Sequence, residues 1–256
     1  MGGLSLQNID VRVSHRKILD DVSVNFAAGR VTVVIGPNGA GKSTLLGVAS
    51  GSIKPHAGVA RLGGEDLRKL PTKQAARRRA VMPQDSHVAF PFTVREVVEM
   101  GRTPWSGSGP ADHDIVEEAL GLTGMTDMAD REITTLSGGE RQRTAFARVI
   151  TQAAPVTGES VMLLDEPTSA MDIAHAETTL SLARTLADRG AAIGIVLHDI
   201  NAAAAFADHM VLMQHGKVRV AGSVGEVCMA ETLSAVYETP IDVFERQGRV
   251  HVIPQR

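Results

Sequence analysis

Short apolar runs alternate with segments of helical periodicity along most of this 256-residue chain. Two of the runs, Val161–Leu164 and Ile193–Leu197, are continuous, which is typical of strands buried on both faces of a sheet. A third, Val31–Ile35, ends a stretch from residue 4 onward whose apolar and polar positions alternate as in antiparallel strands. Helical patterns follow these runs. The alternation predicts an α/β fold with a mostly parallel sheet and an N-terminal antiparallel β part.

The middle of the chain has a different pattern. Helical periodicity is expected over Val94–Gly101, Asp112–Leu120 and Gly139–Gln152, and residues 103–114 have the glycine, serine and proline content of a loop. The other expected elements are a strand and turn at 58–64, helices at 72–80, Ala174–Arg189 and Ala202–Ala207, a strand at Val81–Met82 and a hairpin at 210–221. We therefore expect one domain over 1–256, with a core at about 1–88 and 155–256 and an inserted helical subdomain at about 89–154.

Composition narrows the function classes. The chain is 43% hydrophobic, enough for a real core, and its net charge of −3 does not suggest a nucleic-acid binder. The densest basic patch, Arg77–Arg79 with Lys73, is interpreted as a solvated helix face. No signal segment is recognised at the start and no apolar run approaches membrane-spanning length, so any membrane role is expected to act through a partner.

A glycine-rich motif between a predicted strand and a predicted helix indicates a phosphate site. Residues 36–43 fit G-x-x-x-x-G-K-[ST] in full. Glycines let backbone N–H groups close around phosphate oxygens, and the helix N-terminus adds a partial positive charge. Lys42 is expected to reach the β- and γ-phosphates of ATP, and the Ser43 hydroxyl to bind Mg²⁺. The residues predicted to contact nucleotide here are Gly36, Pro37, Asn38, Gly39, Ala40, Gly41, Lys42, Ser43 and Thr44.

A pair of carboxylates follows the buried strand Val161–Leu164. Asp165 and Glu166 lie at its carboxyl end, where ligands bind in open α/β sheets. We expect Asp165 to hold Mg²⁺ and Glu166 to polarise the attacking water as a general base. An apolar run followed by Asp-Glu is a weak signal alone, and it gains weight from the complete phosphate loop upstream.

A third motif picks out a family. Leu136-Ser-Gly-Gly-Glu-Arg-Gln-Arg143 resembles the signature of ATP-binding-cassette (ABC) ATPases, and Glu140 stands where glutamine is commoner. Ser137, Gly138 and Gly139 form a second anion-binding helix start. One chain thus carries two phosphate-binding surfaces. The resemblance implies a head-to-tail homodimer in which each ATP lies between the Lys42 loop of one chain and the Ser137 loop of the other.

The remaining motifs of this family follow in order. The resemblance implies that Gln84 contacts Mg²⁺ or water and senses a transmembrane partner, that residues 169–172 form the D-loop, and that His198 contacts the γ-phosphate. It also implies an integral membrane permease dimer, a periplasmic substrate-binding protein, and a place at the cytoplasmic face of a bacterial inner membrane. One feature is missing: Val13 stands where the family places an aromatic residue against adenine, so either adenine is held loosely or His15 or Arg16 substitutes.

Further features of the sequence distinguish between classes of ABC ATPase and between cargoes. Soluble DNA-repair ATPases share this signature but carry long heptad coiled coils before it, and this chain has none. Phe90–Trp105, Ala153–Ser160 and Asp172–His175 resemble segments of ATPases that import iron chelates, cobalamin and haem. The Phe-Pro-Phe-Thr-Val form is most similar to haem importers. The expected function is therefore an ATPase that drives haem import, with ferric siderophore or cobalamin import as the alternative.

Overall fold

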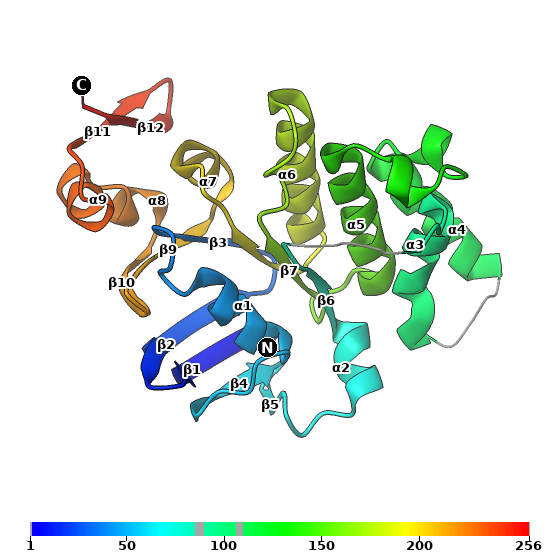
Figure 1. Ribbon diagram of the computed structural model, residues 1–256, viewed down its shortest axis with the longest axis horizontal. Coiled ribbons are helices and arrows are strands. Elements are labelled where there is room, and N and C mark those ends of the chain that lie inside the picture. Colours follow the sequence, from blue (N-terminus) through cyan, green and yellow to red (C-terminus); the bar gives the residue numbers. More distant parts are fainter. Residues whose placement is uncertain (1, 85–89, 106–109, 256) are drawn as a thin grey trace.

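The computed structural model describes residues 2–84, 90–105 and 110–255 (Figure 1). Within them, a central sheet of six strands has the order β10-β9-β3-β8-β7-β6. Strand β10 pairs antiparallel with β9, and all other neighbours pair in parallel. The strands are β3 (Val31–Ile35), β6 (Arg79–Met82), β7 (Val161–Asp165), β8 (Ala192–Val196), β9 (His209–Gln214) and β10 (Lys217–Gly222). The predicted α/β fold is confirmed.

Successive side chains of the central strands enter two different cores. Val33 and Ile35 of β3 belong to the cluster beneath the helices, whereas Val34 packs on the opposite side with residues of the N-terminal sheet. In β7, Met162 and Leu163 divide in the same way. Because both faces are covered, nearly all positions of β3, β7 and β8 are apolar, with Thr32 and Asp165 as buried exceptions, and their sequence runs are nearly continuous.

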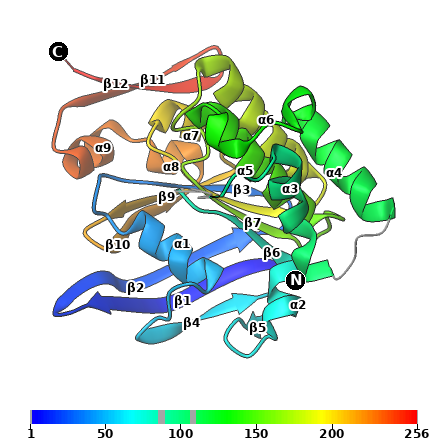
Figure 2. The ribbon, with the colours of Figure 1, turned by 45° about the vertical axis from the view of Figure 1, so that its right-hand side comes forward.

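The N-terminal sheet covers one face of the central sheet. Its strand order is β2-β1-β4-β5, with antiparallel pairing throughout. The strands are β1 (Gly3–Val13), β2 (Arg16–Ala27), β4 (Ala57–Leu62) and β5 (Glu65–Asp66). Helix α1 (Lys42–Ser50) lies between the two sheets (Figure 2) and buries Leu45 and Leu46 against both. The helix that begins at the predicted phosphate site is therefore anchored in a core.

The helical part lies beyond the β6–β7 edge of the central sheet (Figure 1). Its elements are α3 (Val94–Glu99), the 3₁₀ turns η1 (Met100–Trp105), η2 (Thr126–Met128) and η3 (Ile133–Thr135), α4 (Pro110–Leu122) and α5 (Gly138–Ala153). Helix α2 (Thr72–Arg78) lies beside η1. The hydroxyl of Thr93 and the carboxylate of Glu96 form a reciprocal cap that begins α3.

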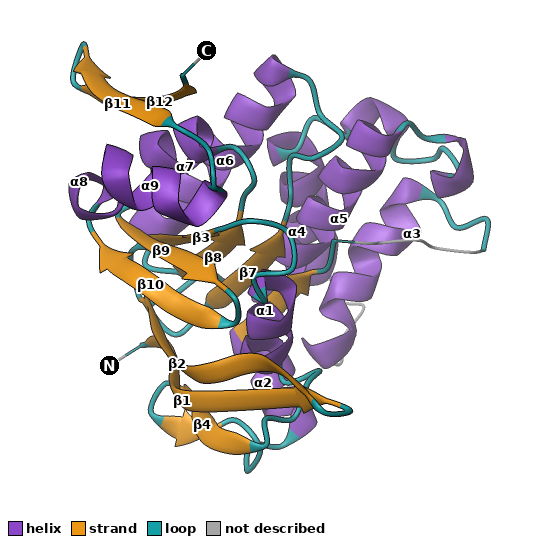
Figure 3. Ribbon diagram, turned by 60° about the vertical axis from the view of Figure 1, so that its left-hand side comes forward, coloured by secondary structure: helices purple, strands orange, loops and turns teal. Residues whose placement is uncertain are grey.

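The C-terminal third covers the other face of the central sheet and extends past it. Helices α6 (Ile173–Asp188) and α7 (Ile200–Phe206) pack on the sheet, followed by α8 (Val224–Val227) and α9 (Ala230–Tyr237). A hairpin of β11 (Ile241–Arg246) and β12 (Arg249–Pro254) then packs on α7 (Figure 3). The side chain of Asn201 pairs with this hairpin: its Nδ2 donates to Val252 O at 3.1 Å and its Oδ1 accepts from Val252 N at 2.8 Å.

Three expectations need correction. The helix expected at 72–80 ends at Arg78, because Arg79 already begins β6. The basic run is not a solvated helix face: Arg77 lies 5.2 Å over the ring of Trp105, and Arg78 pairs with Glu65 at 2.8 Å. These arginines join α2 to its neighbours. The loop expected at residues 103–114 is shorter: η1 extends to Trp105 and α4 begins at Pro110, because proline is compatible with the first turn of a helix. Residues 106–109 of that loop, and the proposed boundary between residues 88 and 89, lie outside the described residues. Among the described residues, no helix combines the length and the apolar character that a bilayer crossing requires.

Candidate nucleotide-binding site

Backbone geometry explains the glycines of the phosphate loop, which joins β3 to α1. Gly36 and Gly41 have φ angles of 146° and 100°, in the region that L-residues avoid. A Cβ atom at Gly36 would lie 2.2 Å from the carbonyl oxygen of Met213. Gly39 has a φ of 77° and open space where its Cβ would be. Packing against Met213 thus requires glycine at position 36. The open space at Gly39 leaves the loop accessible to a ligand.

Lys42 is held at the mouth of this loop. The residue is 6% exposed, and its Nζ donates to Gly36 O at 2.7 Å and to Pro37 O at 3.1 Å. Burial lowers the pKa of Lys42, while the nearby charges of Glu166 and Asp165 act in the opposite direction. The ammonium group thus lies at the loop that would bind phosphates, hydrogen-bonded to two of its carbonyl groups.

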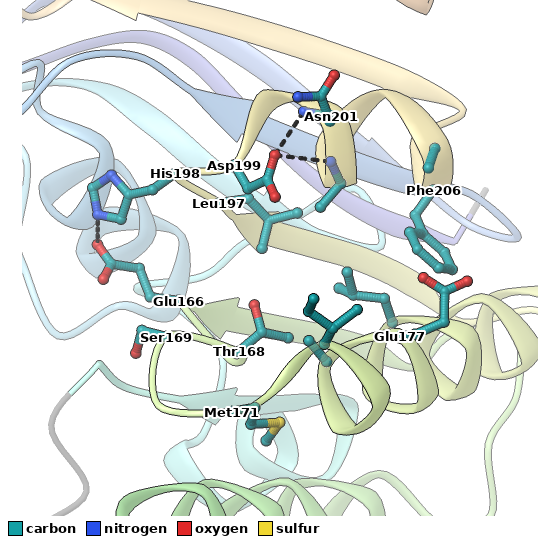
Figure 4. Close-up of a pocket in the computed structure, with 15 residues that line it drawn as sticks. Glu166, Thr168, Ser169, Met171, Glu177, Leu197, His198, Asp199, Asn201 and Phe206 are labelled. Atoms are coloured by element: carbon teal, nitrogen blue, oxygen red, sulfur yellow. Dashed lines mark hydrogen bonds and ion pairs between the residues drawn. The ribbon is translucent and has the colours of Figure 1, made fainter. Parts of the chain in front are cut away.

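Three polar side chains meet at the carboxyl ends of neighbouring parallel strands. Gln84 follows β6, Glu166 follows β7 and His198 follows β8. The Nε2 of Gln84 donates to Glu166 Oε2 at 3.0 Å, and the ring of His198 contacts Glu166 Oε1 through Nε2 (Figure 4). All three were predicted from sequence, and the sheet order brings them together because β6, β7 and β8 are adjacent.

Asp165 has the properties of a cation ligand. Its side chain is buried, and among the described residues its Oδ1 has no hydrogen-bond partner. Burial raises the pKa of Asp165, and a hydrogen bond with the Ser43 side chain works against that increase. An unpaired buried carboxylate oxygen is costly unless a cation or water satisfies it. Asp165 and Ser43 therefore fit an Mg²⁺ ion, whose preferred ligands are oxygen atoms.

The phosphate loop and these polar residues line one open pocket of about 560 Å³. Its lining residues are Arg16, Ile18, Asn38, Gly39, Ala40, Gly41, Lys42, Ser43, Thr44, Gln84, Glu166 and His198. Val13 is 61% exposed and is absent from this lining, as is His15. Arg16 is the residue of that region which the structure places at the pocket. The pocket has the size and the polar groups to take a nucleotide.

Ser137, Gly138 and Gly139 of the signature lie at the start of α5 and do not line this pocket. Ser137 is the N-cap, and its hydroxyl accepts from Glu140 N at 3.3 Å while Glu140 Oε2 accepts from Ser137 N at 2.6 Å. This reciprocal cap was readable as S-x-x-E but was missed in the sequence analysis. A Cβ at Gly139 would lie 3.0 Å from Ala170 O, so the signature glycines also allow the D-loop segment to pack closely.

Comparison with known proteins places this geometry in a family. Residues 19–169 match the family described as ABC transporter. The chain belongs to the ABC transporter family. That stretch contains the phosphate loop, the signature and the Asp165-Glu166 pair.

Several relatives of this ABC transporter chain are similar over nearly its whole length. It is 44% identical to the hemin import ATP-binding protein of Rhodococcus jostii, over 99% of this chain and 86% of that protein. It is 42% identical to the cobalamin import ATP-binding protein of Halobacterium salinarum, over 94% of this chain and 60% of that protein. The fold also resembles a protein described as a metal-chelate type ABC transporter in an inward-facing conformation, with a TM-score of 0.81, 26% identity and coverage of 99% and 97% of the two chains.

One functional candidate of this ABC transporter subunit escaped the sequence analysis. Gln142, on α5, contacts both the backbone of Glu166 and the D-loop residue Ser169. It stands inside the quoted signature, but no spacing rule connects positions that are 24 and 27 residues apart in sequence. Only the packing of α5 against the end of β7 reveals the contact. The described residues contain no cluster of three or more histidine, cysteine or acidic side chains arranged for a metal ion.

Proposed function

We propose that this chain is the ATP-hydrolysing motor subunit of an ABC importer that carries haem across a bacterial inner membrane. The observation that carries the ATPase assignment is the position of Glu166. Its carboxylate lies at the nucleotide pocket, between Gln84 and His198, one residue beyond a buried aspartate with an unpaired oxygen. That arrangement combines a phosphate-binding loop, a cation ligand and a base at one site, and hydrolysis of a nucleoside triphosphate requires all three.

The loop residues bind the phosphates and so fix the position of the nucleotide in the site. Backbone N–H groups of the loop Gly36–Gly41 and the ammonium of Lys42 would hold the β- and γ-phosphates, and Thr44 is a secondary contact. We propose Ser43, Gln84 and Asp165 as the residues that hold Mg²⁺, which supplies neutralisation of the charge on the transferred phosphoryl group. Glu166 orients the attacking water and accepts its proton. His198, in contact with Glu166, is the proposed γ-phosphate contact.

We propose that two copies of the chain share two ATP molecules. The Ser137 helix start and the phosphate loop are separate surfaces of one chain, and Ser137, Gly138 and Gly139 do not line the nucleotide pocket. A head-to-tail pair brings the signature of each chain to the pocket of the other, which completes both sites. A solved ABC transporter cassette with the same fold, 24% identical and with a TM-score of 0.77, is dimeric.

The proposed partners in the membrane are a permease dimer and, through it, a periplasmic substrate-binding protein. The docking surface we assign to the permease lies on the helical part, next to Gln84 in sequence. Phe90 there is 67% exposed and Met100 is 38% exposed, so apolar side chains are available for a partner. In this proposal the subunit is peripheral and lies at the cytoplasmic face of the inner membrane.

The proposed cargo is haem. Its support is the 44% identity to a hemin import ATP-binding protein over 99% of the chain, together with the haem-importer form of Phe90–Val94. In this proposal the helical part contacts the permease, so its sequence varies with the type of permease. The type of permease in turn varies with the cargo that it carries. The cobalamin import relative at 42% identity keeps cobalamin as the second candidate.

The cargo proposal is tested in liposomes that contain the subunit with its cognate permease. Haem-loaded binding protein should raise ATPase activity and lead to haem inside the vesicles. The same vesicles receive ferric siderophore or cobalamin on their own binding proteins, and vesicles with the Glu166→Gln subunit give the background. The isolated subunit should bind ATP without stoichiometric haem. Transport of cobalamin or siderophore in the absence of haem transport would overturn the haem assignment and leave the ATPase assignment intact.

A further inference from the structure

Gln142 joins the signature helix to the hydrolytic site of its own chain. It lies near the start of α5, five residues beyond Ser137, and its side chain points toward the segment that follows β7. Its Nε2 donates to Glu166 O at 3.3 Å and to Ser169 Oγ at 2.7 Å, and its Oε1 accepts from Ala170 N at 3.1 Å. Both hydrogens of the Nε2 amide and the side-chain oxygen are thus in use.

The backbone that Gln142 holds is a strained one. Glu166 has a φ of 51°, a left-handed conformation that a residue with a long side chain adopts only when its surroundings enforce it. The N–H of Glu166 donates to Val196 O of β8 at 3.1 Å, and its C=O accepts from Gln142. Strand β8 and helix α5 therefore fix the two sides of the residue whose carboxylate meets Gln84 and His198.

The signature glycines reinforce the same connection. A Cβ at Gly138 would lie 3.0 Å from the Cβ of Ala170, and one at Gly139 would lie 3.0 Å from Ala170 O. The first turn of α5 and residues 169–171 are consequently in direct contact with no room between them. A displacement of this turn has to move the D-loop and the carbonyl of Glu166 with it, because packed segments transmit displacement.

We propose that Gln142 is a positioning residue that couples the two ATP sites. Contact of Ser137–Gly139 with the nucleotide held by the partner chain shifts the start of α5, and Gln142 passes that shift to Glu166 of its own chain. Each hydrolytic site thereby responds to the occupancy of the other. This inference rests on the shared-site dimer of the proposed function, and it adds the path by which the two sites become cooperative.

The substitution Gln142→Glu removes the hydrogen bond to Glu166 O. Gln142→Glu keeps an oxygen for Ala170 N–H and can accept from the Ser169 hydroxyl, but it has nothing to donate to Glu166 O and sets a carboxylate against that carbonyl. The matched control is Gln152→Glu on the same helix. The Nε2 of Gln152 donates to Ala76 O at 2.9 Å and to Arg79 O at 3.1 Å, so this variant loses comparable backbone contacts away from the site.

The experiment measures ATPase rate against ATP concentration for the complete importer in liposomes. We expect a Hill coefficient above 1 for the wild type and near 1 for Gln142→Glu, with kcat lowered by roughly 10- to 100-fold and KM changed little, because misplacing a base by about 1 Å has an effect of that order. Gln152→Glu should keep the wild-type Hill coefficient even where its melting temperature falls. If Gln142→Glu does not fold, Gln142→Met is measured in its place.

The possible results distinguish a failure of the Gln142 role from a failure of the proposed function. A cooperative wild type together with a Gln142→Glu variant of unchanged Hill coefficient and kcat overturns the role of Gln142 and leaves the shared-site dimer standing. An active wild type with a Hill coefficient of 1 overturns the coupling itself. A wild type without ATPase activity overturns the proposed function.

Discussion

The imidazole of His198 touches the carboxylate of Glu166, although the two residues follow different strands and lie 32 positions apart in the chain. The contact exists because β7 and β8 are parallel neighbours, with Asp165 paired to Val196 at their carboxyl ends. The proposed base and the proposed phosphate contact are thus held together by the sheet rather than by a substrate. Their relative position follows from strand order in this molecule.

Replacement of the base should separate chemistry from binding. Glu166→Gln keeps the size of the side chain but cannot take a proton from water, so ATP hydrolysis should fall by roughly 10²–10⁴-fold while ATP binding is retained. Lys42→Ala should instead weaken ATP binding, because it removes the cation from the phosphate loop. Steady-state turnover and a fluorescent-nucleotide titration give the two readouts. Near-normal turnover in Glu166→Gln would remove Glu166 from the role of base.

Two inactive variants should complement each other if the sites are shared between chains. Ser137→Arg and Lys42→Ala homodimers each lose both composite sites. A mixed dimer retains one intact site, formed by Lys42 of the first variant and Ser137 of the second. An equal mixture should regain at most about a quarter of wild-type ATPase activity, since about half of the dimers are mixed. Full activity of Ser137→Arg alone, or of a strictly monomeric chain, would contradict the shared sites.

The carboxylate of the signature cap should make stability depend on pH. Hydrogen bonds from the Ser137 hydroxyl and then from its backbone N–H lower the pKa of Glu140 below the ordinary 4.5. Its contribution is therefore complete above that ordinary value and is lost as pH falls through the lower folded pKa. Glu140→Gln should destabilise the protein by about 0.3–1 kcal/mol at pH 7 and by less at pH 3. Urea unfolding at both pH values measures the difference.

The control for this effect is the corresponding cap of α3. Hydrogen bonds from Thr93 lower the pKa of Glu96, first through its backbone N–H and then through its hydroxyl, so Glu96→Gln should show the same sign of pH dependence. ATPase activity of Glu140→Gln should stay close to wild type, because position 140 lies beyond the Ser-Gly-Gly surface. A stability difference that grows toward low pH would show that the Glu140 carboxylate does not stabilise the cap.

The C-terminal hairpin should depend on one amide side chain. Asn201→Asp keeps the acceptor for Val252 N–H but loses the donor to Val252 O, a change of about 0.5–1.5 kcal/mol. Amide hydrogen exchange over Ile241–Pro254 should become roughly 2- to 13-fold faster, while the central strands keep their protection. Asn25→Asp, the same chemical change at an exposed position of β2, should leave the hairpin unchanged. Unaltered exchange in Asn201→Asp would mean that other contacts hold the hairpin.

The structure indicates which features a sequence can predict. Strands β3, β7 and β8 were predictable because burial on both faces favours nearly continuous apolar runs, and the loop of Gly36–Ser43 because its backbone conformation requires glycine. Strand β6 was placed two residues late because it starts with Arg79, whose charge argues against a buried strand. The sequence carries no signal for that position. The roles of the predicted site residues and the division into subdomains stay predictions.

The contacts of Gln142 and of the signature glycines with the D-loop were not predictable for a different reason. They depend on how α5 packs against the segment after β7, and packing between segments distant in the chain leaves no periodic pattern in either. A motif read along the sequence therefore identifies the groups that meet a ligand more readily than the groups that hold them in place.

The lining of the pocket at Arg16 and the phosphate loop affects the nucleotide specificity of the subunit. Apart from the imidazole of His198, none of the described residues lining it has an aromatic ring, so the stacking contribution of roughly 1–3 kcal/mol available to a base on such a ring is missing. A guanidinium such as that of Arg16 stacks on purines and pyrimidines alike. Discrimination among bases is then weak, and GTP, CTP and UTP should drive turnover at rates approaching that of ATP.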